Sequence, residues 1–571
     1  MKLSRSWFFY VAFLAVASST AVPAYGQSSG SNARFQIGSS NTVTADPLVP
    51  RPNQRPCIVP LFSNLQFEDF SIKDYQFTPP ADCPGPWKAV VFTADFSVTA
   101  GQQFDRTAIV DLGFVNLYFG TTPEPRRSLA PTWHVERDVT DYSALFENSQ
   151  TGHVILGNVV NSTFNGIISG NAALEFYPSD QGNSALNRRT PDAVLPLTQP
   201  DGQGGVNEPA FLVHATDQLA TSLILPRNVE RAFLDVITQS QIGDEFWYSC
   251  VPNDVANQLQ SCGNTAFREA EISIDGQPAG VAPVYPWIYT GGIDPFLWEP
   301  IPGVQTLNFV PYRVDLTPFA GVLSNGQPHT VAVSVFNADN FFSATATLLL
   351  FLDRDAQQIT GEVTENTIGA NPVPVVNENL QTDSSGNISG TVTVSSSRAF
   401  TVAGFVNTSR GRVDTIVRQD VNFNNSQNFT VNATTFVQDV TQKTTLNSST
   451  TTRSGAVDFS TTETFEYPLT LNIAFQVAAD GSTTQQTTAS QKFKVDVREP
   501  FFASSVSNKV DSTDTLNFSA SGVFTGGTGQ KSSQDYNFAN SRGQSYNCTL
   551  RAENRALTSA SEGCTEQIRF K

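Results

Sequence analysis

Short runs of alternating apolar and polar residues, separated by Gly, Pro and Asn, recur along most of this chain. Val115, Leu117 and Phe119, for example, alternate with Asn116 and Tyr118. Alternation with a period of two predicts β-strands, and no segment shows the sustained period of 3.6 residues that is typical of a helix. The runs lie at residues 87–98, 108–119, 132–139, 153–156 and 172–177, and the pattern resumes from about 211 to 352. We therefore expect an all-β protein of the sandwich or barrel type.

The strand pattern occurs twice. Residues 137–145 correspond to residues 314–322, and each segment is followed by a histidine and an apolar run. Further upstream, residues 104–109 parallel residues 267–272. Two tandem copies of one β-sandwich, of the jelly-roll type, are therefore expected to pack side by side. A junction of this kind creates a cleft, and ligand sites favour domain interfaces.

Beyond about residue 355 the composition shifts towards Ser, Thr and Asn, and aromatic residues become fewer. Alternating stretches persist at residues 390–394, 400–406, 469–477 and 491–497. These stretches predict a third, C-terminal β region, which we expect to form a sandwich of its own. Disorder is the alternative, and both the alternation and a final pair of cysteines argue against it.

The amino terminus has the features of a secretory signal peptide. Lys2 and Arg5 precede an apolar run at residues 7–16, and small residues around Ala24 offer a cleavage site. Because the run is too short to cross a bilayer, we expect a secreted, extracellular protein with no membrane span. The expected organisation is a signal peptide at 1–26, a flexible lead at 27–56, jelly rolls at 57–178 and 211–355 joined by a loop at 179–210, and a glycosylated C-terminal β region at 356–571.

Six cysteines fit an oxidising compartment. Sequence alone does not fix their pairing, but their grouping favours Cys57–Cys83, Cys250–Cys262 and Cys548–Cys564. Nine Asn-x-Ser/Thr sequons are present, and we expect many of them to be glycosylated and hence exposed. They begin at Asn161, Asn387, Asn407, Asn424, Asn428, Asn432, Asn447, Asn517 and Asn547.

A net charge of −18 argues against nucleic acid and anionic membrane surfaces as partners, because like charges repel. Four scattered histidines and oxidised cysteines give no metal-ligand spacing, so we expect no metal. The chain has no P-loop, no Gly-x-Ser-x-Gly elbow and no dinucleotide-binding glycine motif between a strand and a helix. No cofactor is therefore predicted.

Asp105 and Glu245 are the leading candidates for chemistry. Asp105 follows the apolar run 90–99, and Glu245 follows the run 231–238 in the second copy. Equivalent loops of two packed copies can bring both carboxylates to one cleft, where one acts as a base and the other, held protonated, as an acid. The alternative is that both are ordinary charges at the ends of strands.

Several strings in this part of the chain resemble one family. FDRT, FGTTPEP and WHVERDVTDYSALF, with FSNLQFEDFSIKDYQFTPPADCPGPW upstream and GDEFWYSC downstream, are similar to the plant and fungal peptide-N-glycanase family, peptide-N4-(N-acetyl-β-glucosaminyl)asparagine amidase A. The resemblance covers about residues 57–355. It implies a cofactor-free amidase that converts glycosylated Asn to Asp in N-glycopeptides or denatured glycoproteins. It also implies a chain nicked into two associated parts, for which residues 178–208 are the candidate segment.

A shorter bacterial enzyme of the same activity, built from two jelly rolls, implies roles for individual residues. Its catalytic Asp stands in an aromatic-Asp-Arg motif, which residues 104–106 match, and its catalytic Glu precedes a Trp beside a cysteine. Here a Phe separates Glu245 from Trp247, so Asp244 remains an alternative partner. A further acidic residue of that enzyme has no match, because the aligned segment 156–161 offers only asparagines.

The remaining candidates would bind substrate or stabilise charge. Arg106 can position the carboxylates or stabilise an oxyanion, or it can simply form an ion pair with Asp105. Tryptophan faces can stack on a sugar ring, although a core role is the alternative for each. The substrate-binding candidates are Trp298, Trp247, Asp244 and Trp133.

The favoured hypothesis is a secreted amidohydrolase that releases N-linked glycans by cleaving the β-aspartylglucosamine amide bond. In this hypothesis Asp105 activates a water, and Glu245 assists proton transfer to the departing glycosylamine and orients the first GlcNAc. Arg106 stabilises the charge that develops on the oxygen. A non-catalytic glycan-binding or cell-surface protein on the same scaffold is the alternative, because fold does not fix function. A glycosidase, which also uses two carboxylates, is a third possibility.

Overall fold

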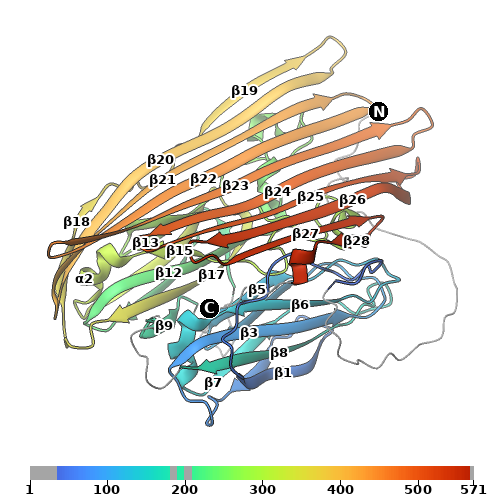
Figure 1. Cartoon of the computed structure of the whole chain (residues 1–571). Coiled ribbons are helices and arrows are strands. Elements are labelled where there is room, and N and C mark those ends of the chain that lie inside the picture. Colours follow the sequence, from blue (N-terminus) through green and yellow to red (C-terminus); the bar gives the residue numbers. More distant parts are fainter. Residues whose placement is uncertain (1–34, 180–188, 199–208, 566–571) are drawn as a thin grey trace.

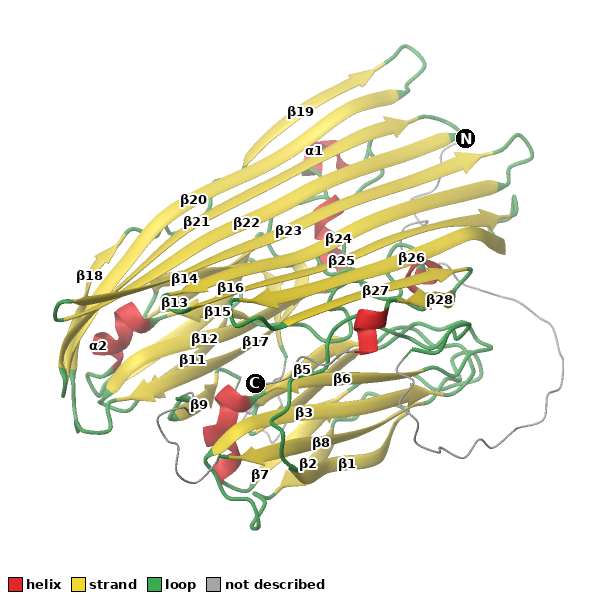
Figure 2. Cartoon of the chain, in the orientation of Figure 1, coloured by secondary structure: helices red, strands yellow, loops and turns green. Residues whose placement is uncertain are grey.

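The computed structural model describes residues 35–179, 189–198 and 209–565. The expected signal peptide lies outside the described residues, as does most of the segment proposed for nicking. The described chain is all-β, as predicted: its strands form five sheets, and its helices are short turns (Figure 2). Figure 1 shows the arrangement, with the large C-terminal sheet on one side, the first sandwich on the other and the second sandwich between them. No helix in the described ranges is long and apolar enough to span a membrane.

Two four-stranded antiparallel sheets form the first sandwich. Their strand orders are β1–β8–β3–β6 and β2–β7–β4–β5, so the chain passes repeatedly between the sheets, as in a jelly roll. The facing side chains share one core that includes Phe92, Leu117, Phe146 and Phe176. The strands are β1 (Cys57–Phe67), β2 (Lys73–Phe77), β3 (Trp87–Val98), β4 (Thr107–Leu112), β5 (Val115–Thr121), β6 (Thr132–Asp138), β7 (Gln150–Ile155) and β8 (Ile168–Pro178).

The second sandwich repeats this topology strand for strand. Its sheet orders are β10–β17–β12–β15 and β11–β16–β13–β14, so each strand corresponds to the one numbered nine lower, which confirms the internal repeat. The strands are β10 (Ala210–His214), β11 (Leu219–Ile224), β12 (Val229–Ser240), β13 (Glu269–Ile274), β14 (Gln277–Pro283), β15 (Tyr312–Asp315), β16 (Pro328–Phe336) and β17 (Asp339–Leu352). An additional strand, β9 (Ala193–Pro196), pairs with β17. It lies inside the segment expected to be a loop, and its Val194 buries its side chain in the core of the first sandwich.

The repeated motif at residues 137–145 and 314–322 forms the same element in both copies. In each, a strand ends and a helical turn follows, η1 (Thr140–Glu147) in the first copy and η6 (Thr317–Phe319) with α2 (Ala320–Leu323) in the second. The other short helices are η3 (Ile242–Asp244), η4 (Trp247–Ser249), α1 (Asn253–Ala256), η5 (Pro295–Trp298) and η7 (Glu562–Thr565).

The C-terminal region forms one eleven-stranded antiparallel sheet. The prediction that this region forms a sandwich of its own is therefore wrong. Seven of its strands are 17 to 21 residues long, and the second jelly roll supplies the opposing layer. Phe423 packs against Trp247, and Tyr467 against Tyr285, with ring centroids 6.3 and 5.0 Å apart. The strands are β18 (Thr360–Asn366), β19 (Val375–Thr382), β20 (Ile388–Thr408), β21 (Gly411–Val431), β22 (Thr435–Ser454), β23 (Val457–Val477), β24 (Thr483–Glu499), β25 (Phe502–Phe518), β26 (Phe524–Asn540), β27 (Ser545–Glu553) and β28 (Ala556–Ala560).

Contacts of the N-terminal segment and three disulfides add to the pairing of the strands. Residues 35–56, expected to belong to a flexible lead, are instead held by distant contacts that their composition does not reveal. Val43 N donates to Pro300 O at 3.0 Å, and Arg51 Nη1 forms an ion pair with Glu136 Oε2 on β6 at 2.6 Å. The three disulfides pair as predicted, Cys57–Cys83, Cys250–Cys262 and Cys548–Cys564.

The two sandwiches meet along the free edge of β5. Thr121 N donates to Thr306 O at 2.9 Å and Phe309 N donates to Phe119 O at 2.8 Å, so the segment before β15 extends the first sandwich. The buried hydroxyl of Tyr118 donates to Leu307 O at 2.6 Å within the same contact. These backbone bonds fix the two sandwiches relative to each other.

Tyr118→Phe should therefore destabilise the protein by about 1–2 kcal/mol, because the buried Leu307 carbonyl loses its hydrogen-bond donor. The measurement is the thermal unfolding midpoint. Tyr285→Phe is the matched control, since the Tyr285 hydroxyl is buried and has no hydrogen-bond partner among the described residues. Equal midpoints for the two variants would contradict the importance of the Tyr118 bond.

Candidate active site

The site lies where equivalent connections of the two sandwiches meet. Residues 99–106 connect β3 to β4, and residues 241–268 connect the corresponding β12 to β13. Residues 122–131 connect β5 to β6, and residues 284–311 connect the corresponding β14 to β15. Thr290 Oγ1 donates to Thr122 O at 2.7 Å, which joins the last two connections directly.

Asp105 is held against a backbone amide of the second sandwich. Its Oδ2 accepts a hydrogen bond from Gly291 N at 3.0 Å. A Cβ on Gly291 would lie 2.2 Å from Glu124 Oε2 and 3.0 Å from Asp105 Oδ1, so only glycine allows both carboxylates this close to the backbone. Burial raises the pKa of Asp105, and both the Gly291 amide and the Arg106 charge oppose the rise.

Glu245 follows η3 at the end of β12 and is the second predicted carboxylate. Burial raises the pKa of Glu245 to about 8, and the negative charge of Asp105 contributes to the rise. The charge of Asp105 thus acts on Glu245, which lies in the equivalent connection of the second sandwich. Tyr289, whose hydroxyl donates to Ser240 O at 2.5 Å, is buried within the field of both carboxylates.

Glu124 is a third carboxylate that the sequence analysis missed. Its Oε2 lies 3.4 Å from Asp105 N. Burial, followed by the charge of Asp105, raises the pKa of Glu124 well above its ordinary value. The repeat contained the signal, because the loop after β5 lies at the same end of the sandwich as the loop with Asp105.

Arg106 lies beside these carboxylates with unused hydrogen-bonding capacity. Its Nε is buried and has no hydrogen-bond partner among the described residues, and its guanidinium carbon lies 5.8 Å from the centre of the Phe104 ring. Burial lowers the pKa of Arg106, and the charges of Asp105 and Glu124 oppose this change. A buried donor without a partner at this position suits the stabilisation of a developing negative charge.

Asp244 has a different environment from its neighbour Glu245. It is fully buried, and its Oδ1 lies 2.7 Å from Arg268 Nη2. Its Oδ2 accepts a hydrogen bond from Asp339 N at 2.6 Å. Both carboxylate oxygens are thus occupied by structural contacts.

The three candidate tryptophans are all buried. Trp247 is 0% exposed and belongs to the core shared with the C-terminal sheet, and Trp133 stacks on Phe96 in the first core. Trp298, 3% exposed, donates from Nε1 to Gly292 O at 3.0 Å. Of the three, Trp298 alone lines the pocket at the junction.

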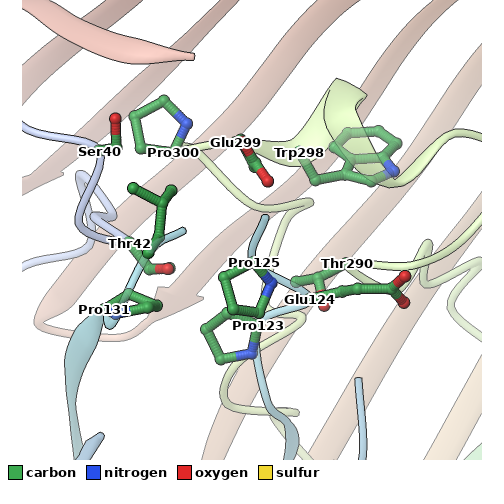
Figure 3. Close-up of a pocket in the computed structure, with 11 residues that line it drawn as sticks. Ser40, Thr42, Pro123, Glu124, Pro125, Pro131, Thr290, Trp298, Glu299 and Pro300 are labelled. Atoms are coloured by element: carbon green, nitrogen blue, oxygen red, sulfur yellow. The ribbon is translucent and has the colours of Figure 1, made fainter. Parts of the chain in front are cut away.

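This small pocket is drawn in Figure 3. It is enclosed by the loop after β5, the connection before β15 and Ser40 and Thr42 of the N-terminal segment. Glu124 and Trp298 lie on the same side of the pocket (Figure 3). Glu299, which also lines it, forms an ion pair with Arg126, with 2.7 Å between Glu299 Oε2 and Arg126 Nε. The pocket therefore borders the carboxylate cluster.

This arrangement brings carboxyl groups in different environments together with an arginine whose Nε has no hydrogen-bond partner among the described residues. The fold and site together define a tandem jelly-roll protein with a cluster of buried carboxyl groups at the junction of its two sandwiches, an arrangement typical of acid–base chemistry.

Comparison with known protein families identifies the family of this chain. The model of peptide N-acetyl-β-D-glucosaminyl asparaginase amidase A matches residues 67–367, and that of the PNGase A C-terminal domain matches residues 391–469. The chain belongs to the peptide N-acetyl-β-D-glucosaminyl asparaginase amidase A family, which confirms the resemblance seen in the sequence.

A similar protein from Prunus dulcis is described as peptide-N4-(N-acetyl-β-glucosaminyl)asparagine amidase A. The two are 32% identical over 365 residues, which is 61% of this chain and 62% of the relative. The match thus spans less than two thirds of the relative's length. Among solved structures, recombinant peptide:N-glycanase F is 15% identical with a TM-score of 0.35, covering 52% of this chain and 96% of that one. PNGF-II is 15% identical with a TM-score of 0.34, covering 52% and 66%.

Glu245→Gln should stabilise the protein at neutral and alkaline pH. The pKa of Glu245 in the folded protein, about 8, exceeds the value of about 4.3 for an exposed Glu. The contribution of the bound proton to the stability of the fold is therefore complete below about pH 4 and is lost as the pH rises through about 8. The thermal midpoint of the variant should therefore exceed that of the parent by several degrees at about pH 8 and hardly at all at about pH 4. The exposed Glu365→Gln serves as the control and should show no pH-dependent difference.

Asp244→Asn, one residue away, should have the opposite effect. The substitution leaves the buried Arg268 guanidinium without its ion partner, which typically costs about 3–5 kcal/mol. A stabilised Asp244 variant, or a destabilised Glu245 variant at about pH 8, would reverse the structural assignments of the two residues.

Proposed function

We propose that this protein is a secreted amidohydrolase that releases N-linked glycans from glycopeptides or denatured glycoproteins by cleaving the β-aspartylglucosamine amide. Family membership supports this assignment. The observation that carries it is the meeting of Asp105 and Glu245 from equivalent loops of two sandwiches, with the pKa of Glu245 raised to about 8. A carboxyl that keeps its proton at neutral pH is an effective general acid.

In the proposed reaction Asp105 takes a proton from a water molecule, whose oxygen attacks the side-chain carbonyl of the glycosylated Asn. Arg106 stabilises the negative charge on the carbonyl oxygen. Collapse of the tetrahedral intermediate breaks the C–N bond, and Glu245 gives its proton to the departing glycosylamine nitrogen. The products are a peptide with Asp in place of Asn and a glycosylamine, which hydrolyses to free glycan and ammonia.

Glu124 complements this pair in our proposal. Burial and the charge of Asp105 raise the pKa of Glu124 well above its ordinary value, which favours the protonated form of Glu124 and reduces the repulsion beside Asp105. Asp105 can then remain ionised, and its own raised pKa makes it a stronger base than an exposed Asp.

For substrate binding we keep Trp298, which borders the carboxylate cluster, and leave out Trp247, Trp133 and Asp244, which serve cores or an ion pair. Export fits the three disulfides and the sequons. Asn424, Asn428, Asn447 and Asn547, for example, are exposed on the face of the C-terminal sheet turned away from the second sandwich. Glycosylation of the nine sequons, cleavage of the signal peptide and nicking of the chain within residues 178–208 remain predictions.

The first test is mass spectrometry of a defined N-glycopeptide after incubation with the secreted protein in 18O-labelled water. Conversion of Asn to Asp with one 18O incorporated is expected, and it should fall by about 10²–10⁴-fold in Asp105→Ala and Glu245→Gln. Alanine is preferred because Asp105→Asn would create an Asn-x-Thr sequon with Thr107.

Glu365→Gln should retain full activity in this assay. A peptide that keeps one GlcNAc would identify a glycosidase instead. Binding of the glycopeptide without turnover by the parent protein would identify a glycan-binding protein.

The pH dependence of kcat should report the proposed acid. Turnover should decline above about pH 8, where Glu245 loses the proton it must donate. The measurement is a kcat–pH profile, and the residual activity of Glu245→Gln should lack this alkaline limb. A limb that persists in the variant would assign the acid to another group.

A further inference from the structure

Four buried amide side chains on the inner face of the C-terminal sheet face the loop that carries Glu245. Three of them each donate a hydrogen bond of 2.8 Å to one of three consecutive backbone carbonyls in that loop. The donor–acceptor pairs are Asn425–Tyr248, Gln438–Ser249 and Gln427–Cys250, and the fourth amide belongs to Gln442. The first held carbonyl is three residues beyond Glu245.

The same amides also form a directional chain with one another. Gln438 Nε2 donates to Gln427 Oε1 at 2.8 Å, and Gln427 Nε2 donates to Asn425 Oδ1 at 3.0 Å. Asn425 Nδ2 donates in turn to Gln442 Oε1 at 2.9 Å. Each amide thus fixes the orientation of the next, and none of the four is more than 2% exposed.

The other second-sandwich connection of the site is held in the same manner. Gln491 on β24 donates to Pro286 O at 2.6 Å and accepts from Val304 N at 2.8 Å, so one side chain bridges both ends of the connection. Gln530 on β26 donates to Glu299 O at 2.9 Å. The amide of Gly291, which holds Asp105, lies within the bridged stretch.

A sheet that only covered a core would need apolar side chains at these positions, because a buried amide is costly unless its hydrogen bonds are satisfied. The irregular loops explain the choice, since their carbonyls have no strand partners and the amides supply the missing donors. The contacts thereby limit the movement of backbone close to both carboxylates. A displacement of about 1 Å in a reacting group can cost about 10²-fold in rate.

We propose that Asn425, Gln427, Gln438 and Gln491 are positioning residues for the reaction, which makes the C-terminal sheet part of the catalytic unit. This inference rests on the amidase function proposed above. It assigns a role in activity to a region that contributes no reacting group.

The test compares three Gln→Met variants of the full chain, in which side-chain volume is nearly kept and the amide is lost. Gln427→Met removes the amide donor of Cys250 O, and Gln438→Met removes that of Ser249 O, which keeps a hydrogen bond from the Ser261 hydroxyl at 2.9 Å. Gln419→Met is the matched control, because Gln419 is also buried on the inner face of β21 but donates to the Tyr312 hydroxyl, outside the site loops, at 3.2 Å. Thermal midpoints, kcat, KM and kcat–pH profiles are measured for each variant with the glycopeptide assay.

Gln427→Met and Gln438→Met should lower kcat by about 10- to 100-fold with little change in KM. Their alkaline limb should move to lower pH, because Glu245 becomes less shielded from solvent. Gln419→Met should lose comparable stability and keep both kcat and the profile. If Gln427→Met does not fold, Gln438→Met, at the donor end of the chain, carries the comparison.

Equal losses of kcat in all three variants, or unchanged kcat and pH profiles in the two site variants, would overturn the positioning role. Absence of turnover by the parent protein would instead overturn the proposed function itself, and the parent arm of the assay separates these two failures.

Discussion

The pairing of the segment before β15 with the free edge of β5 is the contact on which the site depends. Through it, a connection of the second sandwich becomes an extra strand-like layer on the first, with backbone bonds at Thr121 and Phe309. The pairing brings Gly291 against Asp105. The first sandwich alone would carry Asp105 and Glu124 and the second would carry Glu245, so neither contains a complete site.

Burial of acidic groups at this junction is energetically unfavourable, and the cluster contrasts with two other acidic side chains that have arginine partners. Asp244 is matched by Arg268, and Glu136 by Arg51, with short ion pairs. Glu245 has no such compensation and keeps its proton instead. A structure held by extensive sheet packing can tolerate such unfavourable groups, and their concentration in one place is typical of a functional site.

The sequence predicted most of the fold because its signals were local and repeated. Alternation located the strands, and the correspondence of residues 137–145 with 314–322 predicted two equivalent sandwiches. The same alternation could not show what the inner face of the C-terminal strands would pack against, so their single sheet was mistaken for a sandwich. The order of residues 35–56 likewise depends on distant partners that leave no local pattern.

The candidate site was predictable as far as the repeat was used. Asp105 and Glu245 stand at equivalent positions, whereas Glu124, which lies in the adjacent pair of equivalent loops, is not among the predicted residues. The tryptophans illustrate a different limit. Aromatic residues serve cores and sugar sites equally well. Trp247 and Trp298 are both buried, and only the position of Trp298, which lines the pocket beside the cluster, separates the two.

Duplication also explains how two similar carboxyl groups can take different roles. Asp105 accepts a backbone hydrogen bond from the other sandwich and has Arg106 beside it, and both interactions favour its ionised form. Glu245 lies in the equivalent connection, yet burial and the charge of Asp105 both favour its protonated form. The repeat supplies two matching positions, and the asymmetric junction makes one the proposed base and the other the proposed acid. A symmetric pairing of the sandwiches would have given both carboxyls the same environment, so the one-sided contact along β5 is what separates their chemistry.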